Sequence, residues 1–339
     1  MERMRSFSEP LPAEYCNPTL LKHDSLRLHG DLNQEYPPSC PSDKTGDGDS
    51  DVNYRNHLSL TKIQMDVATE LPSEIQEYID KKVYSKLKKR DAQLERVHNQ
   101  MWDDSKNCEL DSRGEDDWRG VLSKAIGAFK GEMISISNDR DWRTDLQPAD
   151  YQFKLNDPRP DISVGLCACP IEEALKPGMG SAATGLLTRL QADAELISGP
   201  YPSCLNLHFP FLIAQTKSGA TGGNLFQAQN QAAVGGCVAL RILRNLSEYH
   251  ARISVSNNVP DQCDQLMSIP VFSITTEGPT IELWAHFQEE NGSSFKMVRL
   301  NVWCMSLKNH CLEALIHISA ILKWGSADLK GTIIEAFSS

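Results

Sequence analysis

Long apolar runs are missing from this sequence of 339 residues. No stretch approaches the roughly 18 uninterrupted apolar residues that a membrane-spanning helix needs, so we predict no membrane span. The stretch from Met1 to Pro12 carries Arg3, Arg5 and Glu9 and has no apolar core of the kind found in secretory signals. We therefore expect an intracellular protein, nuclear or cytoplasmic, without membrane attachment.

The cysteines lack the spacing of a zinc site or a disulfide framework. The sequence contains 10 cysteines, but no Cys-x-x-Cys pair occurs among them. An intracellular setting favours free thiols over disulfides. Cys167 and Cys169 are the tightest pair, and no second pair with zinc spacing follows them. We therefore expect these two side chains to pack within a strand.

The signatures of several enzyme classes are also missing. Gly178 to Ser181 is a glycine-containing loop that follows no predicted strand, so neither a dinucleotide-binding fingerprint nor a P-loop is supported. There is no G-x-S-x-G elbow, and the 9 histidines form no H-E-x-x-H motif. Serine hydrolases of the elbow type and zinc proteases of that motif are therefore not indicated.

Excess positive charge is lacking as well, because the formal net charge is -11 and the isoelectric point is about 5.3. The average field of such a protein does not attract polyanions, so a nucleic-acid partner would need a local basic surface. The densest basic run is Lys81 to Arg90. It is open to two interpretations, a phosphate-binding or nuclear-import patch and the solvated face of a helix.

Composition divides the chain into three parts. Residues 1 to about 70 are rich in proline, serine and other polar residues, and this composition predicts a disordered tail. Residues 71–109 are predicted to form a helical extension, since apolar residues from Ile75 to Leu87 recur at helical spacing and the pattern continues to about Met101. Residues 110–335 are predicted to form one compact domain.

Within that domain the apolar periodicity alternates between helical and strand patterns. Helices are expected near residues 118–129, 186–196, 223–246 and 311–324, and strands near residues 133–136, 161–169, 209–217, 271–276, 281–287 and 295–303. A helix, three strands, a helix and further strands indicate an α/β fold with a central mixed sheet flanked by helices.

Three polar residues stand at the ends of two of these strands. Gln215 and Lys217 project from the same face about 7 Å apart, because side chains alternate along a strand. If the strand that begins at Asp161 pairs antiparallel with the strand that ends at Lys217, all three side chains converge. An aspartate, a second oxygen donor and a lysine in this arrangement suit Mg²⁺ binding and the activation of water for attack on a phosphodiester.

Three segments together resemble the PD-(D/E)XK nuclease-like domains found in many fungal proteins. They are Pro160-Asp161, the run Phe209-Pro-Phe-Leu-Ile-Ala-Gln-Thr-Lys-Ser218, and the helix containing Gln227-Ala-Gln-Asn-Gln-Ala232. The resemblance covers about residues 110 to 335 and implies a PD-(D/E)XK nuclease-like core. The main departure is Gln215, which stands where the family usually has Glu or Asp.

The resemblance implies a role for each matching position. Asp161 and Gln215 would hold Mg²⁺ or Mn²⁺ together with an acid from the first helix, and Lys217 would activate water. Glu115 is the candidate for that acid, with Asp116 and Asp117 as alternatives. Substrate phosphates would be approached by Gln229 and Gln231.

Each of these positions also has an ordinary structural explanation. Asp161 can simply begin a strand, Lys217 can be an exposed strand-end lysine, and Glu115 can stabilise a helix dipole. The two glutamines can face solvent. Two functional hypotheses follow. One is a Mg²⁺-dependent nuclease acting on DNA or RNA, and the other is a catalytically inactive nuclease fold that binds nucleic acid or protein.

Overall fold

The structure is a computed structural model that describes residues 51–66, 70–87, 90–148, 154–203, 206–257, 266, 268–289, 292 and 294–338. The chain divides into two units, Met1–Gly48 and Asp49–Ser339. All described residues belong to the second unit. Residues 1–50, the larger part of the expected disordered tail, lie outside the described residues.

The second unit is built on one mixed sheet of seven strands in the order β1-β7-β6-β5-β4-β3-β2. The pairs β1/β7 and β4/β5 are parallel and the other pairs are antiparallel. The strands are β1 (Ile63–Asp66), β2 (Ile134–Asn138), β3 (Ile162–Leu166), β4 (His208–Lys217), β5 (Val271–Glu277), β6 (Thr280–Gln288) and β7 (Phe295–Cys304). The expected α/β class with a central mixed sheet is confirmed.

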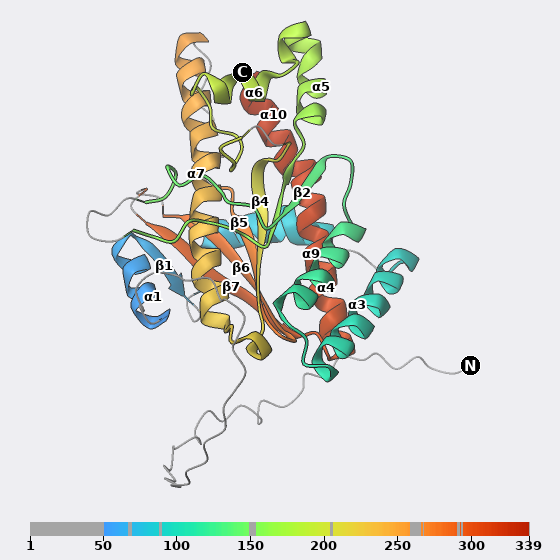
Figure 1. Cartoon of the computed structure of the whole chain (residues 1–339). Helices are drawn as coiled ribbons and strands as arrows, with labels where there is room; N and C mark the ends of the chain where they lie inside the picture. The colour runs from blue at the N-terminus through green and yellow to red at the C-terminus, as the bar shows by residue number, and fades with distance from the viewer. Residues whose placement is uncertain are drawn as a thin grey trace, which may run out of the picture. The chain divides into compact units, whose positions relative to one another are not determined.

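One face of the sheet is covered by the long helix α7 (Leu225–Asn257), which runs along β4 and β5 (Figure 1). The helix lies unusually close to the sheet at Gly236. A Cβ atom there would lie 2.2 Å from Nδ1 of His286. A glycine is therefore required at this position, because any side chain would displace the helix from the strand.

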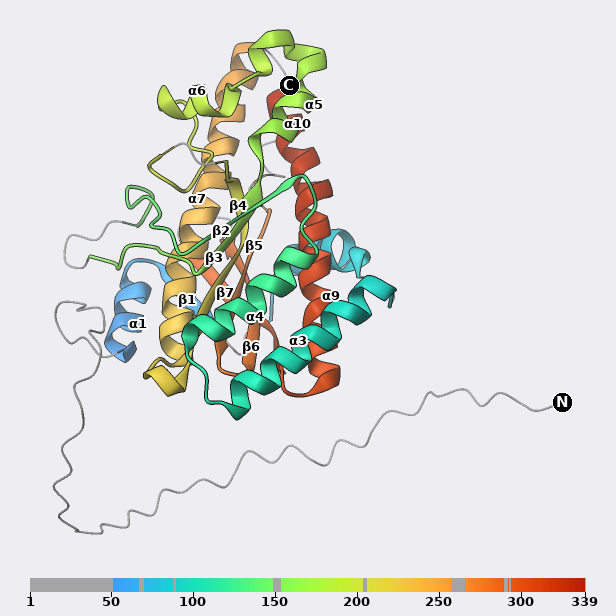
Figure 2. The same ribbon diagram turned by 45° about the vertical axis from the view of Figure 1, so that its right-hand side comes forward.

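The other face is covered by α4 (Glu115–Ala128) and α9 (Lys308–Trp324), with α3 (Ala92–Leu110) packed against both of them (Figure 2). The buried ring of Trp324 anchors α9. It makes edge contacts with Phe211 and Phe272, at centroid distances of 5.9 and 5.5 Å. Large aromatic side chains thus hold this helix layer on the two central strands.

Shorter helices surround these layers. They are α1 (Asp51–Leu60), α2 (Ser73–Tyr78), α5 (Ala168–Met179), α6 (Leu186–Ala192) and α10 (Lys330–Ser338), with short turns at η1 (Ile79–Val83), η2 (Tyr84–Lys86), η3 (Gly180–Ala183), η4 (Gly219–Thr221) and η5 (Gly325–Leu329). α1 packs on α7, and α10 contacts α5 and α7. Across the described residues, no helix combines the length and the apolar character that crossing a membrane requires.

The predicted start of the folded part at about residue 71 is too late. α1 begins at Asp51, and β1 pairs in parallel with β7, placing Ile63 opposite Phe295. Ile63 is buried in the core. Residues 92–110 likewise form α3, which packs on α4 and α9 within the same unit, so they are not a separate extension. The β1 strand was missed because four residues carry too short a pattern to be recognised without their partner strand.

The single long helix expected from Ile75 to Met101 is wrong. Leu87 leaves the helical conformation, and a new helix, α3, begins after Asp91. The Asp91 side chain accepts a hydrogen bond from the N–H of Leu94 at 2.7 Å, which is the geometry of an N-cap. The capping aspartate therefore divides the apolar pattern into two helices.

The basic run Lys81 to Arg90 does not form one open patch among its described residues. Lys81 pairs with Glu77, and Lys86 pairs with Asp328 at 3.0 Å. Lys88 and Lys89 lie outside the described residues. Because these two lysines are paired with acids, the run fits the solvated face of a helix better than a phosphate-binding patch.

The expectation that Cys167 and Cys169 pack within a strand is wrong. β3 ends at Leu166, and α5 begins at Ala168 with Cys167 as its N-cap residue. Cys169 is exposed. Pro170 follows within the first turn of α5, where a missing N–H costs nothing. The proline therefore favours a helix start at the point where the apolar pattern alone suggested a continuing strand.

Candidate active site at the ends of β3 and β4

The antiparallel pairing expected for Asp161 and the strand ending at Lys217 is confirmed. Ile162 lies opposite Ala214 in the register of β3 and β4, so Asp161 comes beside Gln215. Asp161 Oδ2 accepts a hydrogen bond from the backbone N–H of Thr216 at 2.6 Å. This bond ties the aspartate to the carboxyl end of β4.

Lys217 is held by α4. Its Nζ lies 2.8 Å from Glu115 Oε1, and its side chain is only 14% exposed. A Cβ at Gly223 would lie 3.0 Å from Lys217 Cδ, so the loop after β4 also confines the lysine. Lys217 is therefore not an exposed strand-end lysine, and Glu115, the candidate acid expected on the helix before β2, lies beside it.

The two alternative acids of α4 have other partners. Asp116 pairs with Arg119 at 2.7 Å, and Asp117 lies 3.9 Å from Arg113. Of the three acids that the sequence left open, Glu115 is thus the one paired with Lys217.

Asp161 is buried among charges of both signs. Burial raises the pKa of its carboxyl from the ordinary value of 3.8 to about 6. The N–H of Thr216 and the cations of Lys217 and Arg119 act in the opposite direction, while Glu115 adds to the rise. Desolvation therefore outweighs the nearby positive charges, and the charged form of this carboxyl is disfavoured in the folded protein.

Two residues of this site were missed by the sequence analysis, Arg119 and Asp139. Arg119 Nη1 lies 4.0 Å from Asp161 Oδ1 and 3.9 Å from Asp139 Oδ2. Asp139 follows β2 with a positive φ of 49°, and its N–H donates to the carbonyl of Asp161 at 3.0 Å. Arg119 lies one helical turn after Glu115, so the i, i+4 spacing on α4 was the available signal. Asp139 offered no comparable signal.

Gln215 is almost completely enclosed, at 1% exposure. Its Nε2 donates a hydrogen bond of 3.3 Å to the carbonyl of Arg159. The amide nitrogen therefore links β4 to the segment before β3. A carboxylate in its place could not donate this bond.

Polar residues continue from this point across the sheet. Asp139, Asp161, Gln215, Thr275 and Glu282 occupy successive strands, from the end of β2 to β6, and we call them the polar row. Thr275 Oγ1 donates to Glu282 Oε2 at 2.9 Å. The row places polar groups at one level of the sheet, buried from Asp161 to Glu282 and exposed at Asp139.

Glu282, at one end of the polar row, was also missed. Its carboxylate is buried and accepts hydrogen bonds from Arg299 Nη1 at 2.9 Å and from Gln229 Nε2 at 2.7 Å. Its partners come from β5, β7 and α7, which explains why a buried charge is tolerated there. The residue fastens α7 to the sheet.

Gln229 does not face solvent. It is buried, and its Oε1 accepts a hydrogen bond from Arg55 Nη2 at 2.6 Å in addition to its bond to Glu282. The solvent-facing interpretation is therefore wrong for this residue, because it did not consider a buried acceptor beneath α7, and a contact of Gln229 with phosphate stays a prediction. Gln231 is exposed and borders a cavity of ≈ 40 Å³ beside Arg159. Its contact with phosphate stays a prediction.

The donor atoms at this site fit Mg²⁺ or Mn²⁺ in kind. Asp161, Glu115 and Gln215 supply oxygen atoms, and one or two carboxylates with water and phosphate oxygens suffice for Mg²⁺. Their charge favours the metal less, because Lys217 and Arg119 already lie beside the two carboxylates. Within the described ranges no three or more His, Cys, Asp or Glu side chains are grouped so as to hold a metal ion. We therefore expect weak affinity.

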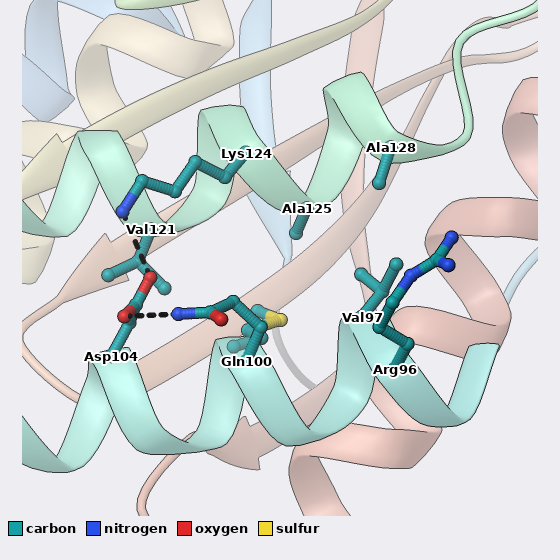
Figure 3. A pocket seen from close by; sticks show the side chains of 9 residues that line it. Arg96, Val97, Gln100, Asp104, Val121, Lys124, Ala125 and Ala128 are labelled. Carbon is teal, nitrogen blue, oxygen red and sulfur yellow. Dashed lines mark hydrogen bonds and ion pairs between the residues drawn. The ribbon is translucent and has the colours of Figure 1, made fainter. Parts of the chain in front are cut away.

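A larger cavity of ≈ 210 Å³ lies elsewhere, in the groove between α3 and α4 (Figure 3). Apolar side chains line much of it. Asp104, which also lines it, accepts hydrogen bonds from Lys124 and Gln100 at 3.0 and 2.8 Å. Asp104 is the one acid that lines it. The groove therefore offers a single carboxylate, whereas Asp139 and Asp161 lie together beside Arg119.

Comparison with known proteins identifies a family. The family model described as "Domain of unknown function (DUF7924)" matches residues 61–336. No curated protein matches the chain. The matched range covers most of the chain and includes β1 and every residue of the polar row. The chain therefore belongs to the DUF7924 family.

Proposed function

We propose that this domain is a metal-dependent nuclease-like phosphodiesterase acting on DNA or RNA. The observation that carries the proposal is the meeting of Glu115, Asp161 and Lys217 at one end of the sheet, with Gln215 beside them. These residues come from α4, β3 and β4. A lysine and two acids gathered at the end of an apolar strand, one of them with a raised pKa, are an arrangement typical of functional sites.

The order of elements supports the proposal. The helix α4, the strands β2, β3 and β4, the helix α7 and the parallel strand β5 follow the order on which the resemblance to PD-(D/E)XK nuclease-like domains rests. The candidate residues lie at the points that the resemblance implies, on α4 and at the ends of β3 and β4. This order of elements favours a PD-(D/E)XK nuclease-like core.

The residues have distinct roles in this proposal. Asp161, Gln215 and Glu115 would hold Mg²⁺ or Mn²⁺, whose chemistry is to polarise a phosphate and to lower the pKa of a bound water. Lys217 orients the attacking water and offsets negative charge that develops on the phosphate oxygens. Its pairing with Glu115 keeps the ammonium in place before substrate binds.

A second candidate function is a catalytically inactive nuclease fold that binds nucleic acid or protein. The observation that favours it is the charge balance of the site. Asp161 and Glu115 lie beside Arg119 and Lys217, and Gln215 provides no negative charge. This balance weakens the attraction for a divalent cation without affecting binding elsewhere on the domain.

Cleavage assays separate the two candidates. Plasmid DNA and single-stranded DNA and RNA would be incubated with Mg²⁺ or Mn²⁺ and the wild type, Asp161→Ala, Lys217→Ala or Asp104→Ala. The nuclease proposal expects metal-dependent cleavage that the first two substitutions abolish and the third, in the groove between α3 and α4, leaves unchanged. No cleavage by the wild type would favour the inactive fold. Cleavage that persists in Asp161→Ala would show that the site is wrong.

A further inference from the structure

Phe226 stands out on the surface near the candidate site. Among the large apolar side chains exposed in the described part of the chain, it is the aromatic one, at 48% exposure. It occupies the first turn of α7, which begins at Leu225. A flat ring exposed at the start of a helix is suited to stacking on another planar group.

The ring lies at the same end of the sheet as the candidate site. β4 ends at Lys217, and the chain returns into α7 through Gly223, where an added Cβ would lie 3.0 Å from the lysine side chain. One turn beyond Phe226, Gln229 contacts Glu282 of the polar row. Phe226 is therefore about 4.5 Å along the helix axis from a residue that contacts the row.

Arg55 holds the ring from one side. Its guanidinium carbon lies 4.2 Å from the centroid of the Phe226 ring. The guanidinium is itself fixed by hydrogen bonds to Gln229 Oε1 at 2.6 Å and to Asn230 Oδ1 at 3.2 Å. The ring is thus ordered before any ligand binds, and a preordered aromatic loses little entropy when a second planar group stacks on it.

We propose that Phe226, backed by Arg55, is a stacking platform for an unpaired base of a nucleic acid strand whose backbone lies at the Lys217 end of the sheet. The inference rests on the proposed action on nucleic acid and narrows the substrate to single strands, or to bases displaced from a duplex. Paired bases inside a duplex do not expose their faces to such a ring.

The surroundings favour a base over an apolar protein surface. The chain from Ser218 to Asn224 consists of serine, glycine, alanine, threonine and asparagine, so the ring is not part of a broad apolar patch on that side. Electrostatic attraction of a nucleic acid strand to the protein is weak, because the net charge is -11 and Lys217 is paired with Glu115. Stacking does not need positive charge, and it therefore supplies binding where phosphate contacts are few.

The test measures binding of labelled oligonucleotides by fluorescence anisotropy in EDTA, so that cleavage does not interfere. An oligothymidylate strand and a duplex of equal length would be titrated with wild type, Phe226→Ala, Phe226→Trp and Met179→Ala. Met179 is the matched control, because it is apolar, 36% exposed and at the end of α5. Thermal unfolding checks that each variant is folded.

The platform predicts that Phe226→Ala weakens single-strand binding about ten-fold, that Phe226→Trp preserves it, and that Met179→Ala has no effect. Duplex affinity should be unchanged in all variants. Equal single-strand affinity of wild type and Phe226→Ala would overturn the platform while leaving the proposed function in place. An equal loss for duplex would overturn the preference for unpaired bases. A wild type that binds neither strand nor duplex would overturn the proposed function together with the platform.

Discussion

Arg119 Nη1 lies 4.0 Å from Asp161 Oδ1, so a cation of the protein itself stands beside the acid proposed to hold a metal. The same nitrogen lies 3.9 Å from Asp139 Oδ2. One guanidinium is therefore shared between acids at the ends of β2 and β3. A divalent cation at Asp161 would be repelled by it.

Arg119→Gln is therefore expected to strengthen metal binding. At about 4 Å and an effective dielectric of about 20, a unit-charge pair is worth about 4 kcal/mol, and solvent screening reduces this because the arginine is partly exposed. We expect Mn²⁺ affinity to rise about ten-fold, measured by titration calorimetry. Arg96→Gln, in the groove between α3 and α4, is the control and should bind Mn²⁺ as the wild type does. Unchanged affinity in Arg119→Gln would mean that the guanidinium does not compete with the metal.

Gln215→Glu should lower the stability of the domain and raise its affinity for metal. The glutamate cannot donate to the Arg159 carbonyl and places a buried negative charge beside Asp161. We expect a loss of about 1–3 kcal/mol in the free energy of unfolding in EDTA, with recovery on addition of Mn²⁺. Thermal and urea unfolding with and without Mn²⁺ measure both effects. Gln231→Glu, exposed on α7, should show neither of them. A Gln215→Glu variant that Mn²⁺ does not stabilise would argue against residue 215 as a metal ligand.

The sequence alone was sufficient to predict the elements that local patterns of apolar residues encode. The apolar runs ending at Lys217 and Trp303 predicted β4 and β7, and the helical spacing from Trp118 predicted α4. The approach of Asp161 to Gln215 followed only on the condition that the two strands pair antiparallel, which the register of β3 and β4 confirms. The predictions of β4, β7 and α4 needed no knowledge of distant partners.

The missed residues depend on contacts between segments far apart in the chain. Asp139 matters because its backbone bonds to Asp161, and Glu282 because Gln229 and Arg299 surround it. Nothing near Glu282 in the sequence marks it as buried, since a glutamate in a strand is ordinarily placed on the solvent face. For the same reason Gln229 was predicted to contact substrate phosphate or to face solvent, although α7 places it against Glu282 of the sheet.

The buried histidines should make stability depend on pH. Burial lowers the pKa of His208 to about 4 and that of His286 to about 3, from 6.5. Between about pH 6.5 and about pH 4 the unfolded chain binds protons that the folded chain does not, so stability falls as the pH falls, by about 1.4 kcal/mol per pH unit for each histidine. His208→Gln should reduce the slope of unfolding free energy against pH by that amount, as measured by urea unfolding. An unchanged slope would show that His208 is protonated in the folded state.

Asp161→Asn should stabilise the domain at neutral pH while removing the proposed activity. The folded carboxyl has a pKa of about 6, above the ordinary 3.8, so its contribution to stability is present below about pH 3.8 and is lost as the pH rises through 6. Asparagine keeps an oxygen that can accept the N–H of Thr216 and carries no charge to desolvate. The variant should therefore exceed the wild type by at most about 3 kcal/mol in free energy of unfolding above about pH 6, and the difference should vanish near pH 4, which serves as the internal control. Urea unfolding across this range measures the difference. A variant that is less stable than the wild type at neutral pH would show that Lys217 and Arg119 stabilise the Asp161 carboxylate by more than its burial costs.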